Sequence, residues 1–431
     1  MSTSEQPSSL APFRSPDFVR LFVANATVTF ASRAMAVVLG YQVYAITGST
    51  LALGLLGLVE AIPSVGLALY GGHVADRYDR PTILRWTLAA LIVCAALLTG
   101  LQWLDDGHAQ LIMLYAVVFV AGIARGFAEP AASALEAQVV PWEMLVHSST
   151  LMATCWMTAA VIGPLVGGVA FKALGAAPTY AGIAVLYMAG RTAVGRMAAR
   201  PVGDTSEHES IWASVSQGVR YVVRDQVLLG SMALDLFAVL FGGAIALLPV
   251  FASDILHVDS VGLGMLNAAP TSGALLTMLW ATRRPPVKHA GRNLFLAVAG
   301  FGVAMIVFAL STSFWLSMVA LFASGVFDGV SVVIRRSILR LLSPEHLRGR
   351  IAAVSMIFIG SSNELGALES GVAASLLGTV RSVWLGGIVT LVVVAGAAIL
   401  APKLRQLSLD PKVAARRDAE VDRQMDAEPS V

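Results

Sequence analysis

The stretch GGHVADRYDRP at residues 71–81 lies between two long apolar runs and is the most informative part of this sequence. Each flanking run is about 20 residues long, the length that a helix needs to cross a bilayer. A short charged connection that begins with glycine indicates a tight hairpin turn. The stretch therefore predicts two antiparallel membrane-spanning helices joined outside the membrane.

The composition extends this interpretation to the whole chain of 431 residues. Hydrophobic residues make up 57% and charged residues 13%, with a mean hydropathy of +0.75. Soluble domains carry about 25% charged residues, so we predict a membrane protein with many spans, and a nucleic-acid-binding protein does not fit. Cys94 and Cys155 lie in apolar segments, which indicates buried free thiols rather than a disulfide or metal framework.

Hydropathy predicts twelve spans, and Ser15 followed by Pro16 marks the start of the first. Their approximate limits are 18–45, 51–72, 82–104, 110–137, 146–174, 177–196, 227–252, 261–281, 292–311, 313–341, 350–378 and 381–401. We divide the chain into an N-terminal tail (1–17), a first six-helix bundle (18–196), a linker (197–226), a second six-helix bundle (227–401) and a C-terminal tail (402–431). Within the linker, Ser210–Val223 fits an amphipathic helix on the membrane surface.

The distribution of basic residues predicts the orientation. We place 25 of the 29 Lys and Arg residues on one side, counting those near the ends of spans with the adjoining loops, so that five of them, Arg335 included, belong to the connection after span 10. Only Lys172 and Arg381 lie on the other side, and Arg33 and Arg125 lie within spans. Cytoplasmic loops carry the excess of Lys and Arg. We therefore expect both termini in the cytoplasm, which requires an even number of spans.

The second half of the chain repeats the first. At an offset of 203 residues, Gly122, Gly126 and Gly163 correspond to Gly325, Gly329 and Gly366, and at an offset of 207, Gly57, Pro63 and Gly66 correspond to Gly264, Pro270 and Gly273. The registers align spans 4 and 5 with 10 and 11, and span 2 with span 8. A six-helix unit duplicated in parallel is typical of transporters that work by alternating access.

Eight ionisable residues fall inside the predicted spans, where a charge costs several kcal/mol unless it is paired or hydrated. They are Arg33, Glu60, Arg125, Glu129, Asp235, Asp328, Glu364 and Glu369. Six acids oppose two arginines, and a carboxyl group exposed alternately to the two sides of the membrane can carry protons. We therefore consider all six acids as proton-coupling residues and favour Asp235 or Glu60.

Simpler roles stay open for several of these residues. Arg125 and Glu129 are four residues apart and could pair on one helix face. Glu60 corresponds to Asn267 in the repeat and could make a polar contact between helices. Glu364 and Glu369 could lie near an aqueous opening.

Two motifs resemble those of the major facilitator superfamily of transporters. The pattern Gly72-x-x-x-Asp76-Arg77-x-x-Arg80 is similar to its signature loop between helices 2 and 3, although Asp79 and Pro81 replace a glycine and a basic residue. The segment Gly163-Pro164-Leu165-Val166-Gly167-Gly168 resembles part of the motif of antiporting exporters, without that motif's upstream glycines. A bent packing helix with no directional meaning is the alternative, since proline bends a helix and glycine allows close packing.

The resemblance implies that helices 1, 4, 7 and 10 line a central cavity. Arg33 and Arg125 would then face Asp235 and Asp328 across it, which suggests ion pairs or charge complementarity between the halves. It also implies that Asp76 lies against the start of helix 11, near Arg350. Arg77 and Arg80 are within reach of Glu136, and such contacts would hold the cytoplasmic side closed.

Several further segments resemble the enterobactin-exporter-like branch, which includes drug-efflux relatives. They are Leu234-Asp235-Leu236, Leu247-Leu248-Pro249-Val250-Phe251, Gly264–Pro270, Ser331–Arg335, Arg348-Gly349-Arg350, Ser362–Gly366 and Glu369-Ser370-Gly371. The resemblance implies an exporter of the bacterial inner membrane that is driven by protons. Arg33 and Glu136 depart from this branch.

The sequence thus predicts a secondary transporter that exports a small molecule, a siderophore or drug-like compound, by proton antiport. Apolar side chains, among them Phe237, Phe241, Tyr115, Met152 and Trp156, would line the cavity or pack between helices. The alternatives are an uptake symporter of the same fold and a membrane scaffold or receptor that transports nothing. We expect a monomer in the lipid bilayer that uses no cofactor or metal, and not an enzyme, because no nucleophile–base constellation or phosphate-binding loop is found.

Overall fold

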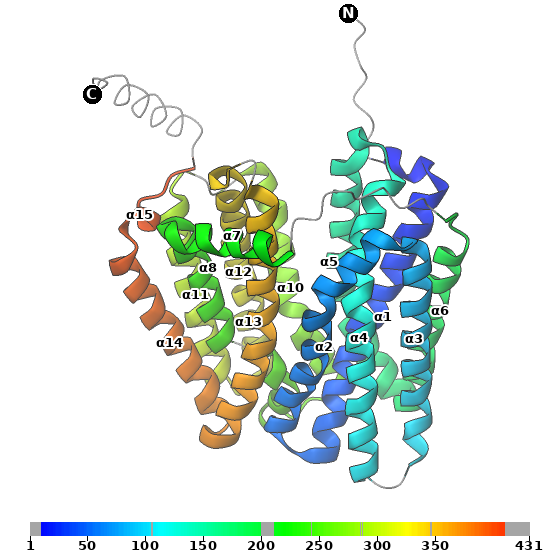
Figure 1. Ribbon diagram of the computed structural model, residues 1–431. Helices are drawn as coiled ribbons and strands as arrows, with labels where there is room; N and C mark the ends of the chain where they lie inside the picture. Colours follow the sequence, from blue (N-terminus) through cyan, green and yellow to red (C-terminus); the bar gives the residue numbers. More distant parts are fainter. Residues whose placement is uncertain are drawn as a thin grey trace, which may run out of the picture.

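The computed structural model describes residues 10–104, 107–199, 211–242, 244–284, 286, 288–344 and 347–409. The described residues form helices and short connections, without strands. Figure 1 shows two bundles side by side, with α1–α6 in one and α8–α14 in the other. The chain is an all-α integral membrane protein of two pseudo-symmetric six-helix bundles, as the sequence predicts.

The first bundle consists of α1 (Pro16–Thr47), α2 (Thr50–Arg77), α3 (Arg80–Gly100), α4 (Gly107–Val139), α5 (Leu145–Leu174) and α6 (Ala176–Gly195). The linker forms α7 (Ile211–Arg224). The second bundle consists of α8 (Gln226–Phe241), α10 (Ser260–Arg283), α11 (Ala290–Leu310), α12 (Phe314–Leu342), α13 (Arg348–Leu377) and α14 (Thr379–Leu400), followed by the short α15 (Pro402–Arg405). Nine segments of the described chain are long and apolar enough to span a membrane, and the more polar α6, α10 and α13 complete the twelve.

The connection between α2 and α3 is shorter than predicted. α2 continues through Gly71 and Gly72 to Arg77, and α3 begins at Arg80, so the predicted turn at 71–81 is wrong over most of its length. Gly71 packs against α4 instead, because a Cβ atom there would lie 3.1 Å from the Cα of Phe127. A glycine that we interpreted as a turn residue therefore allows two helices to approach closely.

The seventh span is interrupted, which the predicted single helix at 227–252 did not anticipate. α8 ends at Phe241, and after a short 3-10 segment (Ala244–Leu247) and α9 (Leu248–Val250) the chain forms a π-helix over Phe251–Ile255. At the break, a Cβ atom on Gly242 would meet the ring of Phe301 in α11. Gly242 therefore allows the end of α8 to approach α11 closely.

The packing of the glycines confirms the internal repeat. A Cβ atom on Gly122 would lie 2.7 Å from Cγ of Pro63, and one on Gly325 would lie 2.7 Å from Cα of Pro270. One turn further, Gly126 packs against Leu67 and Gly329 against Ala274. The offset of 203 residues relates the glycines of α4 to those of α12, and the offset of 207 relates their partners in α2 to those in α10. The contact between α2 and α4 is therefore repeated between α10 and α12.

The two bundles contact each other through α5 with α10 and through α2 with α13. A Cβ atom on Gly264 would lie 3.1 Å from the carbonyl carbon of Pro164, and one on Gly54 would lie 3.1 Å from Cα of Gly371. These contacts lie at the end of the bundles opposite to the Tyr78–Asp79 connection. We call this end the joined end, and the end with Tyr78–Asp79 and most Lys and Arg residues the basic end.

The linker helix α7 packs against the start of α13, and Figure 1 shows it lying across the other helices. A Cβ atom on Gly218 would lie 3.1 Å from the carbonyl carbon of Arg350, and the Arg350 guanidinium donates to Oε1 of Gln217. The helix predicted over 210–223 is therefore confirmed from Ile211 onward, and Ser210 lies outside the described residues. The position of this helix at the membrane surface stays a prediction.

Candidate functional site

In the first bundle, Arg125 of α4 forms an ion pair with Glu60 of α2. Both side chains are 27% exposed, so the pair is partly buried between the two helices. The partner of Arg125 is therefore Glu60 and not Glu129, the alternative that their spacing suggested. Glu129 is exposed on α4. The pair compensates two of the predicted intramembrane charges within one bundle.

Arg33 of α1 lies in the same bundle, but it is held differently. Its guanidinium carbon lies 4.9 Å from the ring centroid of Trp156 in α5, a cation–π contact. Arg33 also interacts electrostatically with Arg125 and Glu129. No carboxylate oxygen of the described residues lies within 4 Å of its guanidinium.

In the second bundle, one arginine holds two carboxylates. Arg335 of α12 forms an ion pair with Asp235 of α8, and its Nη2 lies 3.9 Å from Oδ1 of Asp328. Asp235 and Arg335 are buried, whereas the Asp328 side chain is 44% exposed. Nε of Arg335 also donates to Oγ of Ser331 at 3.2 Å.

Arg335 lies within α12 and inside the bundle, not in the basic connection after span 10 that the sequence predicts for it. The signal was present, since Arg335 follows Asp328 by seven residues, which places both on one face of a helix after two turns. The partners of the intramembrane charges therefore differ from those predicted. The predicted pairing of Arg33 and Arg125 with Asp235 and Asp328 across the cavity is wrong for this conformation, because Arg125, Asp235 and Asp328 all find partners within their own bundle.

The two glutamates of α13 are described to different extents. Glu369 is partly buried and its Oε2 lies 3.5 Å from Oγ of Ser370, which donates to it. The side chain of Glu364 lies outside those that the structure describes.

At the basic end, Asp76 pairs within its own helix–turn segment. Its Oδ1 lies 3.9 Å from Nη2 of Arg80, and the Asp76 side chain is 59% exposed. Arg80 also donates to the carbonyl oxygens of Ala75 at 3.1 Å and Ala134 at 3.4 Å. Among the described residues, none at the start of α13 is paired with Asp76 in this conformation, so the predicted contact is not found there.

The acid on α4 that we expected near this loop has other partners. Oε1 of Glu136 accepts hydrogen bonds from Ser148 at 2.8 Å and Ser149 at 3.0 Å. Arg80 contacts the carbonyl of Ala134 in α4 instead, so its predicted contact with Glu136 is not found. Gly72 and Arg77 lie in the last two turns of α2.

The segment that resembles the antiport motif lies where α5 meets two other helices. Gly163 and Gly167 face α1, since their Cβ atoms would lie 2.7 Å from Cβ of Arg33 and 3.1 Å from Cβ of Ala34. Pro164 and Gly168 face α10, where Ser260 donates to the carbonyl of Gly168 at 2.8 Å. The motif thus joins α1 to α5 and the first bundle to the second.

An ion pair also links the bundles at the joined end. Nζ of Lys172 lies 2.6 Å from Oδ2 of Asp259, and the same carboxylate accepts hydrogen bonds from the N–H groups of Val261 and Gly262. The hydrogen bond from Lys172, and next the one from Gly262, lower the pKa of Asp259 below its usual value. Beside it, the Tyr44 hydroxyl of α1 donates to Asp254.

We expect the Lys172–Asp259 pair to stabilise the protein at neutral pH and to lose this effect in acid. Because folding lowers the pKa of Asp259, the contribution is lost as the pH falls through that lowered value. Both side chains are more than one third exposed, so the coupling should not exceed about 1 kcal/mol.

A double-mutant cycle of Lys172→Met and Asp259→Asn on thermal unfolding measures this coupling at neutral pH and below about pH 3. Asparagine preserves the cap of α10, so the cycle isolates the charge. A coupling that is unchanged in acid and in high salt would contradict the prediction.

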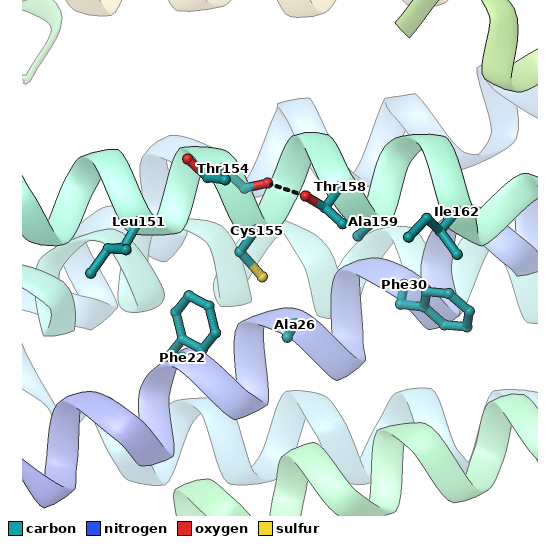
Figure 2. A pocket seen from close by; sticks show the side chains of 9 residues that line it. All are labelled: Phe22, Ala26, Phe30, Leu151, Thr154, Cys155, Thr158, Ala159 and Ile162. Carbon is teal, nitrogen blue, oxygen red and sulfur yellow. Dashed lines mark hydrogen bonds between the residues drawn. The ribbon is translucent and has the colours of Figure 1, made fainter. Parts of the chain in front are cut away.

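A groove of about 340 Å³ runs between α1 and α5. Figure 2 shows its lining, in which Phe22, Ala26 and Phe30 of α1 face Leu151, Cys155 and Ile162 of α5. The hydroxyls of Thr154 and Thr158 donate to the carbonyls four residues earlier in α5, so they present little polarity. The groove is therefore an apolar surface.

The aromatic and Met side chains predicted to line the cavity separate into two groups. Trp156 and Phe237 are exposed, and the ring of Phe237 stacks on that of Phe241 at 6.2 Å. Met152 is buried, and the Tyr115 hydroxyl donates to the carbonyl of Ala52 at 2.8 Å, so these two pack between helices.

Known proteins of similar sequence are efflux transporters. The chain is 23% identical to the multidrug efflux pump Tap of Mycolicibacterium fortuitum over 85% of this chain and 90% of that protein. It is also 23% identical to the enterobactin exporter EntS of Citrobacter koseri over 92% of this chain and 95% of that protein.

Solved structures confirm the fold. A bacterial homolog of the human lysosomal transporter Spinster superposes with a TM-score of 0.71 at 14% identity, over 92% of this chain and 99% of that one. A POT family transporter superposes with a TM-score of 0.71 at 12% identity, over 90% and 96%. The model of the transmembrane secretion effector family, within the major facilitator superfamily, matches residues 7–428. The chain therefore belongs to this family of membrane transporters and is not an enzyme.

Proposed function

We propose that this protein exports a small molecule by alternating access, driven by antiport of protons. The observation that carries the proposal is that the main contacts between the bundles lie at the joined end, while Arg125, Asp235 and Asp328 are paired within their own bundles. These pairs need not break when one bundle tilts against the other. The names of the relatives favour a drug-like compound or a siderophore as substrate.

The excess of Lys and Arg at the basic end supports a cytoplasmic position for that end. The conformation would then be closed toward the outside. We propose that the protein lies in a bacterial inner membrane as a monomer with both termini in the cytoplasm. The bundles would correspond to residues 18–196 and 227–401, with 197–226 as a cytoplasmic linker.

The proton site is best placed at Asp235, Asp328 and Arg335. Two carboxylates and one guanidinium leave one negative charge, and a single proton removes it. Asp328 is 44% exposed, which gives this cluster a route for the proton from water, whereas Asp235 is buried. Glu60 is the weaker candidate, because its pair with Arg125 is already neutral. Glu129 and Glu369 stay candidates.

Flux in inverted membrane vesicles with an imposed proton gradient tests the proposal, with an anionic fluorescent dye and an iron-free catecholate siderophore as probes. We expect accumulation that collapses when nigericin removes the gradient. Asp235→Asn should abolish accumulation but leave exchange of labelled for unlabelled substrate. Asp225→Asn, ten residues earlier at the N-cap of α8, is the matched control and should transport normally. Movement that ignores the gradient and survives Asp235→Asn would refute the proposal, and movement in the opposite direction would identify an uptake symporter.

Asp76→Asn should impair transport while leaving the folded protein intact. In this conformation Asp76 is exposed and its pair with Arg80 is long, so its loss should cost less than about 1 kcal/mol of stability. In the outward-open state Asp76 would approach the start of α13, and losing that contact should slow transport by about tenfold. Vesicle flux and thermal unfolding measure the two effects, with Glu143→Gln as an exposed acid control at the same end. Normal flux in Asp76→Asn would disprove the gating role.

A further inference from the structure

We propose that Arg33 binds the negative charge of the substrate, so that the transported compounds are organic anions. The inference deepens the export function proposed above and rests on it. It starts from a difference among the arginines of the spans. Arg125 and Arg335 each have a carboxylate partner, whereas no carboxylate of the described residues lies within 4 Å of Arg33.

An arginine at bilayer depth is costly unless an anion or water compensates it. Arg33 is half-buried, and its guanidinium carbon lies 4.9 Å from the ring centroid of Trp156. A ring face attracts the cation without accepting its N–H bonds. Part of the hydrogen-bonding capacity of the guanidinium is therefore available to a ligand.

The geometry presents the guanidinium rather than burying it. Gly163 gives α1 and α5 the close approach that places Arg33 beside Trp156, because a Cβ atom there would lie 2.7 Å from Cβ of Arg33. Trp156 is 46% exposed, so the stacked pair borders open space. A guanidinium has five donors in a planar fork, which suits the two oxygens of a carboxylate, sulfonate or phosphate. The exposed part of the indole suits an aromatic or apolar body next to that charge.

The structural alternative is that Arg33 only balances Glu129, the exposed acid with which it interacts at longer range. The two roles predict opposite effects of Glu129→Gln. If Glu129 is the counter-ion, its loss leaves Arg33 uncompensated and weakens the fold. If Arg33 binds the substrate, the loss of Glu129 removes a repelling charge and strengthens the binding of anions.

Binding to the purified full-length protein in nanodiscs tests the proposal without transport or a proton gradient. The probes are 2-naphthoate, 2-naphthyl phosphate and the neutral 2-naphthamide, measured by calorimetry. We expect the two anions to bind and the amide not to bind. Arg33→Gln should weaken 2-naphthoate binding by roughly 10- to 100-fold, Arg33→Lys should retain part of it, and Glu129→Gln should strengthen it. Arg381→Gln, an exposed arginine at the joined end, is the matched control and should bind like the wild type.

Three outcomes would overturn the inference. They are equal binding of 2-naphthamide, wild-type affinity in Arg33→Gln, and failure of the wild type to bind either anion at millimolar concentration. Comparing the carboxylate with the phosphate shows which anionic group fits better. Anion binding without proton-driven flux would leave this inference standing and refute the proton coupling. Proton-driven flux without anion binding would refute this inference and leave the proton coupling standing.

Discussion

Arg335→Gln is expected to destabilise the folded protein by about 3–5 kcal/mol, because it leaves a buried carboxylate without its partner. Asp235 is 8% exposed and Asp328 lies on the other side of the same guanidinium. Without the arginine, the two carboxylates repel each other in a region of low dielectric constant. Thermal unfolding in detergent, together with the yield of monodisperse protein, measures the loss.

A second substitution should reverse most of this effect. In the double variant Asp235→Asn/Arg335→Gln, the buried charge is gone and the two amides can bond to each other, so stability should return close to that of the wild type. Arg336→Gln is the matched control, since Arg336 is the exposed neighbour on the same helix. If the double variant is as unstable as Arg335→Gln, the arginine acts through packing and not through charge.

Gly325→Val should disrupt the second bundle, and its repeat counterpart Gly122→Val the first. A Cβ atom on Gly325 would lie 2.7 Å from Cα of Pro270, and one on Gly122 would meet the backbone of Glu60. Backbone atoms cannot rotate away as side chains do, so the helices must separate. We expect a loss of about 3 kcal/mol or more in each case, visible as a lower unfolding temperature and less folded protein.

Gly396→Val in α14 provides the control for this pair, because no atom lies within 4 Å of the added Cβ. It should fold as the wild type does, and α14 should gain slightly in helix propensity. Normal folding of Gly325→Val would mean that α10 and α12 are not in contact as described. Unequal effects of Gly122→Val and Gly325→Val would show that the two bundles differ in tolerance despite their common packing.

The sequence predicted the helices and their repeat better than the partners of the charges. Matching offsets aligned Gly122 with Gly325 and Pro63 with Pro270, and the structure shows that each glycine packs against the proline of its own half. The partner of Arg125 was harder to predict, since spacing identifies neighbours on one helix, such as Glu129, but not a residue on another helix, such as Glu60.

Two further errors have the same origin. Glycine followed by charged residues is typical of a turn, so the sequence around Gly71 predicts one. Only the contact with α4 shows that Gly71 allows two helices to pack closely. Arg335 follows a hydrophobic stretch and precedes several basic residues, so it was assigned to a loop, although its partner Asp235 lies on another helix inside the bundle. In both cases the role of the residue depends on its contact with another helix, α4 for Gly71 and α8 for Arg335. A local sequence pattern contains no information about such a contact.

The glycine contacts at the joined end have an energetic consequence for switching. Gly54, Gly168, Gly264 and Gly371 bring backbone against backbone, and apolar side chains beside them, among them Leu53, Leu263 and Leu266, are buried in a core that runs through both bundles. Separating the bundles there would expose apolar surface, so the binding of protons and substrate must offset that cost. A population ratio can be moved from 1:99 to 99:1 by about 5.5 kcal/mol of differential binding. Two conformations of nearly equal free energy would bring that shift within reach of one proton and one small ligand.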